Sequence, residues 1–533
     1  MRLISRPRCV LLLCAALLAG AGVAVAATPA SAAIATVSEL NEALGDGSLS
    51  SEALVRLLLA RIDAYDKAGP HLNALLALNP KAIDEAKALD AERKRRGPRG
   101  PLHGIPVILK DNIDTADLPT TGGSVLLRGS LPPDDAFVVR RLRAAGAIVL
   151  AKANMSEFAL GAAFSSMGGQ MRNPHDIDRT PAGSSGGTAV AIAAAYAPVG
   201  LGTDTGGSIR APAFATGIVG LKPTLGLISR DGIIPLALSL DTVGPMARSV
   251  SDVALVLDVL TGVDASDPAT RSSEGRYARN YRESLNPRAL ERARIGVVRN
   301  FMGYDREADW VVESALTAMR ARGATVVDVR FPDWLIQDAS RFYGVIVDSE
   351  FAAQLPAYLR TLAPGYPKTL QEISSRSRQF LAPQADGSVP NPARWANMEK
   401  QAQAVALDDY RYLAVRQHAL PLVQAVVEGM LAADQLDAIV YSTWEREAGL
   451  IDGGRAGEGR AFVECIANLA GAPELVVPAG FTSHGMPIGL SFLGKRFDEA
   501  RLLSVGHGFE RATQALRLPV HAPPLRQEQA SRP

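Results

Sequence analysis

Short apolar strands alternate with amphipathic helices along most of this chain, and this alternation restricts its fold more than any other feature of the sequence. Helices are expected after the capping box Thr36-Val-Ser-Glu39 and after Asn79-Pro80, where an asparagine N-cap precedes proline at the first helical position. Further helices are expected at about 134–145, 187–197, 309–322, 396–434 and 498–515, and strands at 105–109, 148–151, 199–202, 295–298, 325–329, 437–441, 474–477 and 487–493. This alternation predicts an α/β fold with helices on both faces of a sheet.

Composition places the chain among ordinary globular proteins. Of its 533 residues, 56 are Lys or Arg and 55 are Asp or Glu, the formal net charge is +1, and 47% are hydrophobic. These values exclude a disordered chain, a collagen-like fibre and a coiled-coil rod, and the balanced charge argues against a general nucleic-acid binder. No Pro/Ser-rich linker divides the sequence, so we expect one large domain over residues 34–533, within which residues 333–400 have weak periodicity.

The first 33 residues are expected to be an export signal rather than part of the fold. Arginines near the start precede an apolar run at 9–27, and small residues follow, so that cleavage after Ala26 or Ala33 would suit a signal peptidase. A membrane anchor is the alternative, because a bilayer span needs about 20 apolar residues. Of the three cysteines, two leave with the signal, so Cys465 can form no intramolecular disulfide. The mature protein is expected to be periplasmic or secreted and free of the membrane.

Lys110 ends the apolar run Gly104-Ile-Pro-Val-Ile-Leu-Lys110. A lysine at the end of a buried strand is expected to be partly buried, which disfavours its charged form and lowers its pKa. A neutral lysine is a usable general base. Taken alone, however, the pattern favours a lysine that reaches solvent or pairs with Asp111, so a catalytic role needs support from other residues.

Two glycine-rich segments place serines beside backbone N–H groups. The first, Thr180-Pro-Ala-Gly-Ser-Ser-Gly-Gly187, opens an alanine-rich helix and exposes the hydroxyls of Ser184 and Ser185 at its start. In the second, Gly202-Thr-Asp-Thr-Gly-Gly-Ser-Ile-Arg210, consecutive glycines allow N–H groups to converge as an oxyanion hole requires, and Ser208 follows where a nucleophile would lie. A simple serine N-cap and a glycine-rich turn without chemistry are the structural alternatives.

The combination of Lys110 with these two glycine-rich segments resembles the amidase signature family. The resemblance continues through Gly220-Leu-Lys-Pro-Thr224, Asp241-Thr-Val-Gly-Pro-Met-Ala-Arg-Ser-Val250 and Asn468-Leu-Ala-Gly-Ala-Pro473, and it covers most of residues 36–515. It implies one large mixed sheet wrapped by helices. It also implies that no metal or organic cofactor is used.

The same resemblance implies a Ser-cisSer-Lys triad that hydrolyses amides. Ser208 matches the nucleophile, Ser184 matches the bridging serine beside an unusual cis peptide, and Lys110 matches the base. A serine hydroxyl is a weak nucleophile without an adjacent base. The neutral lysine would therefore take a proton from Ser184, which would take one from Ser208.

The glycine-rich loop would stabilise the negative charge that forms on the carbonyl oxygen. The resemblance assigns the oxyanion hole to the backbone N–H groups of Thr205, Gly206, Gly207 and Ser208. It also suggests that Asp204 and Arg210 support this loop rather than contact the substrate.

Three other functions fit parts of the sequence. Gly183-Ser-Ser-Gly-Gly187 also matches a nucleophile elbow with Ser185 as nucleophile and His418 or His507 as partner, but such an elbow should follow a buried strand and residues 178–182 do not form one. An exported solute-binding protein would need none of the lysine–serine set. The amidotransferase component that this family contributes to tRNA charging works where translation occurs, which the export signal opposes.

The substrate is the feature that the sequence specifies least. The export signal, Arg99-Gly-Pro-Leu-His-Gly-Ile-Pro106 and Ser229-Arg-Asp-Gly-Ile-Ile-Pro235 resemble exported peptide amidases, so C-terminal peptide amides are the expected substrates. The serine segments follow the broader amidase pattern, which leaves general acylamide or aryl-amide hydrolysis open. Substrate contacts are expected from about 333–465, and the enzyme is expected to be a monomer or a homodimer.

Overall fold

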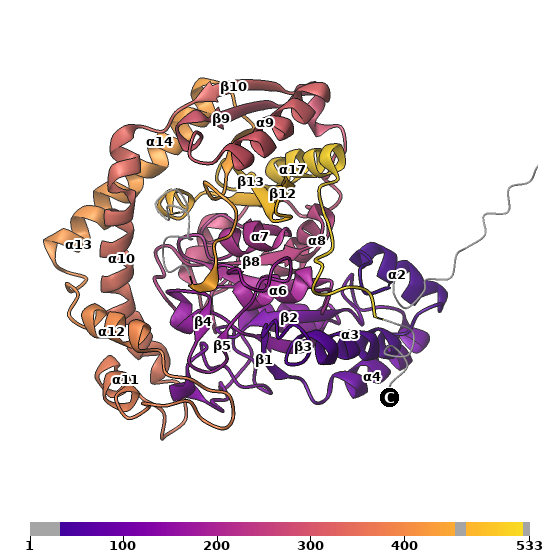
Figure 1. Cartoon of the computed structure of the whole chain (residues 1–533), viewed down its shortest axis with the longest axis vertical. Helices are drawn as coiled ribbons and strands as arrows, with labels where there is room; N and C mark the ends of the chain where they lie inside the picture. Colours follow the sequence, from indigo (N-terminus) through magenta and orange to yellow (C-terminus); the bar gives the residue numbers. More distant parts are fainter. Residues whose placement is uncertain (1–31, 453–464, 526–533) are drawn as a thin grey trace, which may run out of the picture.

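A computed structural model describes residues 32–452 and 465–525, and a large mixed sheet crosses the molecule that they form (Figure 1). In sheet order the strands are β1 (Leu75–Leu78), β3 (Ile148–Ala153), β2 (Pro106–Lys110), β6 (Val199–Asp204), β8 (Thr242–Ala247), β7 (Val219–Lys222), β12 (Glu474–Phe481), β13 (Pro487–Leu493), β11 (Ala438–Ser442), β9 (Arg294–Val298) and β10 (Thr325–Val329). Strands β3, β2 and β6 are parallel, as are β11, β9 and β10, whereas the strands from β6 across to β11 pair antiparallel.

Helices cover both faces of this sheet, as expected. Along β11, Ala438 and Val440 pack into one apolar cluster, whereas Ile439 and Tyr441 pack into another. Helices α9 (Arg306–Ala321) and α17 (Glu499–Thr513) contribute buried side chains to the first cluster, and α10 (Asp333–Leu359) and α14 (Leu420–Ala433) contribute to the second. Because successive strand residues point to opposite faces, the two clusters are the two sides of the sheet. The α/β fold class is therefore confirmed.

Most expected elements are present, with shifted boundaries. The capping box at Thr36 begins α2 (Val37–Asp46), with the Glu39 carboxylate 2.7 Å from the Thr36 amide. The N-cap expected at Asn79 is wrong, because the helix begins at Ala82 and Asn79 instead accepts the Lys81 amide through its side chain. The remaining helices are α3 (Ser51–Tyr65), α4 (Ala82–Arg96), α5 (Phe137–Ala144), α6 (Gly186–Ala193), α7 (Arg210–Thr216), α8 (Val250–Leu260), α11 (Leu370–Ser377), α12 (Pro392–Gln401), α13 (Tyr410–Ala414) and α16 (Ile466–Leu469).

The region of weak periodicity forms a helical arc beside the sheet (Figure 1). Its main member is α10, a helix of 27 residues that contains Pro356 and is followed by α11 and α12. The single helical stretch expected at 396–434 is divided, because α12 ends at Gln401 and a new N-cap at Asp409 begins α13.

The folded part begins before the expected domain boundary at residue 34. Ala32 and Ala33 are buried, and the Ala33 carbonyl accepts a hydrogen bond of 3.1 Å from Arg248 Nη2. The rest of the expected export signal, residues 1–31, lies outside the described residues, so the signal and its cleavage stay predictions.

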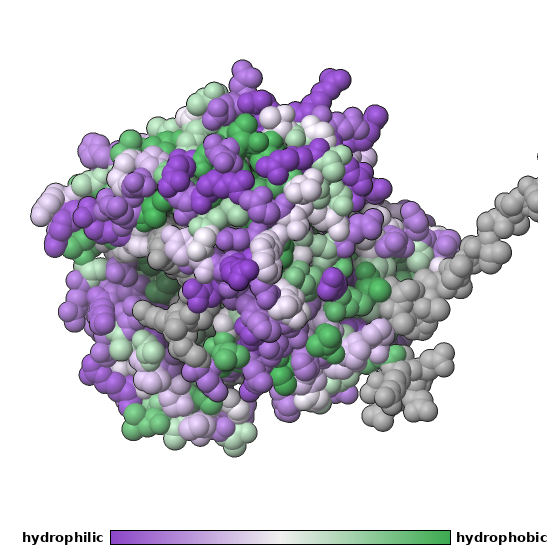
Figure 2. Space-filling model, turned by 45° about the horizontal axis from the view of Figure 1, so that its top comes forward, coloured by the Kyte–Doolittle hydropathy of each residue, from purple (hydrophilic) through white to green (hydrophobic). Residues whose placement is uncertain are grey.

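One face of the molecule is mainly polar. On the face shown in Figure 2, hydrophilic residues predominate and apolar residues form small separate groups. Within residues 32–452 and 465–525, no helix combines the length and apolar character needed to cross a membrane. Cys465 is buried.

Candidate active site

The parallel pair β2 and β6 brings Lys110 beside Thr203. Leu109 faces Leu201 across this pair, so the carboxyl ends of both strands lie at the same edge of the sheet. Lys110 Nζ lies 2.6 Å from Ser184 Oγ, 2.7 Å from Thr203 Oγ1 and 3.2 Å from the Thr203 carbonyl oxygen. This lysine is completely buried rather than exposed or paired with Asp111. Asp111 pairs instead with Lys152, at 3.4 Å.

Burial lowers the pKa of Lys110 to about 7, although the nearby carboxylates of Asp204 and Asp241 favour its charged form. An ammonium group removed from water loses more solvation than these two partly screened charges restore. A substantial fraction of Lys110 is therefore neutral near pH 7, as a general base requires.

Ser184 lies in the turn before α6, directly beside the lysine. The Gly183–Ser184 peptide bond is cis, and the Ser184 carbonyl accepts a hydrogen bond of 3.1 Å from the Ser156 amide. Its hydroxyl has Lys110 as a partner and is almost completely buried. The site therefore brings Lys110 and Ser184 into direct contact, as the sequence predicts.

Ser185 has a different environment from Ser184. Its hydroxyl donates to the Thr203 carbonyl at 3.1 Å and accepts from the Thr203 amide at 3.2 Å, and the side chain is fully buried. In the part of the chain that the structure describes, no histidine is bonded to it. This geometry does not support Ser185 as an elbow nucleophile.

Ser208 lies in the loop between β6 and α7. Its carbonyl accepts a hydrogen bond of 3.1 Å from the Ser185 amide, which fixes the two serine-bearing segments against each other. Ser208 is partly exposed, whereas most of its neighbours in the loop are buried. Among the described residues, no hydrogen bond joins Ser208 Oγ to Ser184 Oγ. Ser208 is thus next to the lysine–serine pair without being bonded to it.

The N–H groups of the loop are not equivalent. The Gly207 amide donates to Asp204 Oδ1 at 2.8 Å, so this expected oxyanion donor already has a partner. Gly206 and Ser208 are the partly exposed residues of the loop, and within residues 32–452 and 465–525 their amides have no bonded acceptor. The Thr205 hydroxyl donates to Asp241 at 2.5 Å. The arrangement leaves Gly206 and Ser208 as the more available donors.

Glycine is required at both central positions of this loop for different reasons. A Cβ atom on Gly206 would lie 2.5 Å from the ring of Tyr343, which belongs to α10. Gly207 has a φ of +126°, which side chains other than glycine rarely adopt. The helical arc therefore packs directly against the loop that carries Ser208.

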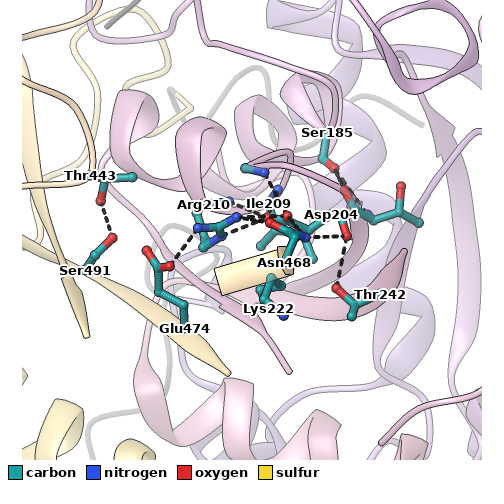
Figure 3. A network of polar contacts seen from close by, with 12 residues as sticks. Ser185, Asp204, Ile209, Arg210, Lys222, Thr242, Thr443, Asn468, Glu474 and Ser491 are labelled. Atoms are coloured by element: carbon teal, nitrogen blue, oxygen red, sulfur yellow. Dashed lines mark hydrogen bonds and ion pairs between the residues drawn. The ribbon is translucent and has the colours of Figure 1, made fainter. Parts of the chain in front are cut away.

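Asp204 and Arg210 form a buried ionic network below the loop (Figure 3). Arg210 Nε and Nη2 donate to the Asp204 carboxylate, both at 3.1 Å, and Asp204 also accepts the Gly207 and Ile209 amides. On its other side, Arg210 pairs with Glu474 at 2.7 Å and donates to Asn468 Oδ1 at 2.6 Å. The network therefore connects the loop to β12 and α16, far along the chain.

The electrostatics of this network keep both central groups charged. Burial alone would raise the pKa of Asp204, but the adjacent Arg210 outweighs it and holds that pKa well below its usual range. Burial would likewise lower the pKa of Arg210, and the carboxylates of Asp204 and Glu474 raise it instead. A bidentate arginine–carboxylate pair gives a rigid geometry, which suits a support for the loop.

The sequence did not predict every residue that touches these groups. Thr203, Asn112, Asp241 and Glu474 each contact the lysine, the loop or its network. Asn468 belongs to one of the family motifs, but its contact with Arg210 was not predicted. In the described residues, no three His, Cys, Asp or Glu side chains form a group suited to a metal ion.

Comparisons with known proteins agree with this geometry. The amidase family model matches residues 53–503. The crystal structure of the peptide amidase from Stenotrophomonas maltophilia is 40% identical and superimposes with a TM-score of 0.83, covering 91% of this chain and 98% of that one. An amidase family protein from Bacillus anthracis is 31% identical with a TM-score of 0.81, covering 92% and 93% of the two chains.

A curated relative carries a different activity. The glutamyl-tRNA(Gln) amidotransferase subunit from Halorhodospira halophila is 40% identical over 493 residues, which cover 90% of this chain and 97% of that protein. Matches over this length at this identity establish common descent across the whole fold. This chain therefore belongs to the amidase family and is an enzyme that acts on linear amide C–N bonds.

Proposed function

We propose that the chain hydrolyses carboxamides through an acyl-enzyme on Ser208, with Ser184 and Lys110 as the proton relay. The observation that carries this proposal is the buried contact of 2.6 Å between Lys110 Nζ and Ser184 Oγ, next to the loop that holds Ser208. A lysine with a pKa of about 7 can accept a proton from a hydroxyl at neutral pH.

In the first half-reaction, Ser208 Oγ attacks the carbonyl carbon of the amide. Its proton passes to Ser184 as the Ser184 proton passes to Lys110, and the relay returns a proton to the nitrogen as the C–N bond breaks. Ser208 reaches Ser184 by rotation of its side chain when substrate binds, since catalytic hydrogen bonds are often long in substrate-free enzymes. Water then attacks the acyl ester through the same relay and releases the carboxylic acid.

The oxyanion hole of this mechanism consists of loop N–H groups. The amides of Thr205, Gly206 and Ser208 supply the donors. The Gly207 amide already donates to Asp204, so it contributes only if it divides this hydrogen bond between Asp204 and the substrate oxygen. Loss of one such donor typically costs about 2.7–4 kcal/mol of transition-state stabilisation.

For the substrate, we propose C-terminal peptide amides, which yield a peptide acid and ammonia. The support is the 40% identity and the full-length match to the Stenotrophomonas peptide amidase, together with the expected export signal. An exported enzyme would meet peptides in the periplasm or outside the cell. General acylamides and aryl amides use the same chemistry at Ser208 and differ only in what surrounds the scissile bond.

A second candidate substrate is glutamine. The amidotransferase subunit from Halorhodospira matches this chain with the same 40% identity, so identity alone does not favour one relative. The expected export signal favours peptide amides, because tRNA charging takes place in the cytoplasm. Cell fractionation with an antibody would test the proposed location.

The test is ammonia release by the purified protein, with Ser208→Ala as the control. The panel contains peptide amides, glutamine, aliphatic amides and anilides, the last followed by the released chromophore. Serine-dependent release from peptide amides supports the proposal, and release confined to another class would replace the substrate. A fluorophosphonate probe should label Ser208, and labelling of Ser185 instead would contradict the triad.

A further inference from the structure

Lys110 Nζ has three hydrogen-bond partners, and a neutral amine has two hydrogens and one lone pair with which to meet them. The Thr203 carbonyl, at 3.2 Å from Nζ, can only accept, so one N–H must point toward it. The second N–H and the lone pair are shared between the hydroxyls of Ser184 and Thr203, at 2.6 and 2.7 Å. Which hydroxyl faces the lone pair therefore decides whether Ser184 can give up its proton.

Thr203 can compete with Ser184 for the lone pair. If the Thr203 hydroxyl donated to the amine, the remaining N–H would point at Ser184, and no base would face that serine. If Thr203 accepts the N–H instead, the lone pair faces Ser184. The second arrangement needs another acceptor for the Thr203 hydroxyl hydrogen.

Asn112 lies beside Thr203 and can provide this acceptor. Its side chain is 2% exposed, its Nδ2 donates to Thr203 Oγ1 at 3.0 Å, and its Oδ1 is buried with no hydrogen-bond partner among the described groups. Turning the amide by 180° about the Cβ–Cγ bond exchanges its nitrogen and oxygen. Oδ1 then accepts the Thr203 hydroxyl, and the nitrogen takes the buried position that Oδ1 held. Asn112 and Thr203 both line a cavity that can hold about one water.

We propose that Asn112 and Thr203 are positioning residues that direct the lone pair of Lys110 toward Ser184. Asn112 takes the hydroxyl hydrogen of Thr203, Thr203 takes a hydrogen of Lys110, and Ser184 then donates to the lone pair. Neither residue exchanges a proton with the substrate. The inference rests on the proposed function, because it assigns a role relative to the catalytic lysine.

The test compares rates of Ser208 labelling by a fluorophosphonate across pH in matched variants of the full-length protein. Thr203→Val removes the hydroxyl and should slow labelling about 10- to 100-fold, since misorientation of a catalytic group can cost about 100-fold. Thr203→Ser keeps the hydroxyl and should label within about threefold of the wild type. Asn112→Ala should resemble Thr203→Val.

Asn112→Asp separates positioning from a merely structural role. The carboxylate still accepts the Thr203 hydroxyl but adds a negative charge to the carboxylates of Asp204 and Asp241 near Lys110. It should therefore move the acid limb of the labelling profile to higher pH, with a plateau within about threefold of the wild type. Equal slowing at every pH, without a shift of the limb, would overturn the positioning role.

Lys110→Ala distinguishes failure of the inference from failure of the proposed function. Normal labelling in Lys110→Ala would contradict the triad itself. Loss of labelling in Lys110→Ala, with wild-type rates in both Thr203→Val and Asn112→Ala, would overturn the positioning role alone. Thermal unfolding of each variant checks that the fold is kept, and Thr203→Ser supplies the comparison should a larger change unfold the protein.

Discussion

The chemistry of Lys110 depends strongly on its buried surroundings. Because burial lowers its pKa to about 7, the fraction of neutral amine decreases about tenfold per pH unit below that value. We expect kcat/KM for the best amide substrate to increase with pH and to level off above about pH 7. A pH–rate profile measures this directly.

Lys110→Arg is the matched control for that profile. Arginine keeps its positive charge at all accessible pH values, so this variant should be inactive throughout the profile while retaining the fold. Appreciable activity in Lys110→Arg at high pH would contradict the role of a neutral amine.

Asp204 fixes the conformation of the loop that carries Ser208. Its carboxylate accepts the Gly207 and Ile209 amides and pairs with fully buried Arg210. Asp204→Ala leaves that arginine with Glu474 as its remaining anion, and breaking a buried pair costs about 3–5 kcal/mol. Urea denaturation should show a loss of this size together with strongly reduced labelling of Ser208.

Glu474→Gln is the comparison for Asp204→Ala. It removes a charge from the same network but touches no amide of the loop, so Ser208 labelling should decrease less than in Asp204→Ala. Equal loss of labelling in both variants would mean that charge alone, rather than loop geometry, controls the site.

At the residue scale, the contacts of side chains that belong to recognisable motifs could be predicted from the sequence. The contacts of side chains outside such motifs could not. Lys110 and Ser184 lie in motifs that resemble the amidase signature family, and this resemblance allowed their contact to be anticipated. Thr203 and Asn112 are unremarkable in the sequence, and they matter only because β2 and β6 are neighbours. The bond between Gly207 and Asp204 was likewise not predictable, because it depends on the conformation of the loop.

At the element scale, α10 is attached to the segment that follows Lys110 by a partly buried hydrogen bond. The Tyr358 hydroxyl of this helix donates to Asp114 Oδ1 at 2.8 Å, four residues after Lys110 in the chain. Burial raises the pKa of Asp114 to about 7. In the unfolded chain this carboxyl titrates near pH 4. Between these values the folded protein holds a proton that the unfolded chain has lost, so this group makes stability decrease as pH rises.

Asp114→Asn should remove this pH-dependent contribution. The free energy of unfolding of the variant, relative to the wild type, should increase from about pH 4 to 7 and stay constant above, because the amide has no proton to lose. Tyr358→Phe removes only the hydrogen bond and should cost about 0.5–1.5 kcal/mol. Urea denaturation at several pH values measures both, and a difference for Asp114→Asn that is independent of pH would contradict this interpretation.

Elements with clear apolar periodicity could be predicted, whereas irregular ones could not. β10 and β13 occupy the expected residues, and β9 begins one residue before the expected boundary. β7 and β8 were not anticipated, because glycine interrupts both strands and proline also interrupts β8. The neighbouring strands of the sheet, rather than propensity, stabilise them. The helix α10 contains Pro356, and a proline inside a helix weakens the sequence signal for that helix.

At the scale of the whole molecule, the fold class follows from the alternation of elements, but the strand order does not. β12 and β13, near the end of the chain, lie inside the sheet, with β12 beside β7 and β13 beside β11. Contacts this distant in sequence leave no local signal. The site depends on them, because Glu474 of β12 supports the loop that follows β6.

The expected export signal and the folded domain meet at Ala32 and Ala33, and this meeting point predicts where cleavage occurs. Both alanines are buried, and Arg248, itself 6% exposed, donates to the Ala33 carbonyl as well as to the carbonyls of Ile192 and Ala197. Cleavage after Ala33 would remove one acceptor and place a new ammonium group near a buried guanidinium. Cleavage after Ala26 would leave these contacts intact, so we expect the mature protein to begin at residue 27.

N-terminal sequencing of the exported protein tests this prediction, and two recombinant chains test its physical reason. A chain starting at residue 34 should be less stable to urea than one starting at residue 27, because Arg248 Nη2 loses the Ala33 carbonyl at 3.1 Å and keeps the longer contact of 3.4 Å to the Ala35 carbonyl. The expected difference is about 0.5–1.5 kcal/mol, the net contribution of one hydrogen bond. Arg248→Met removes that donor from both chains, so the difference between them should shrink. Equal stability of the two chains, together with a mature N-terminus at residue 34, would show that Ala32 and Ala33 belong to the signal and not to the fold.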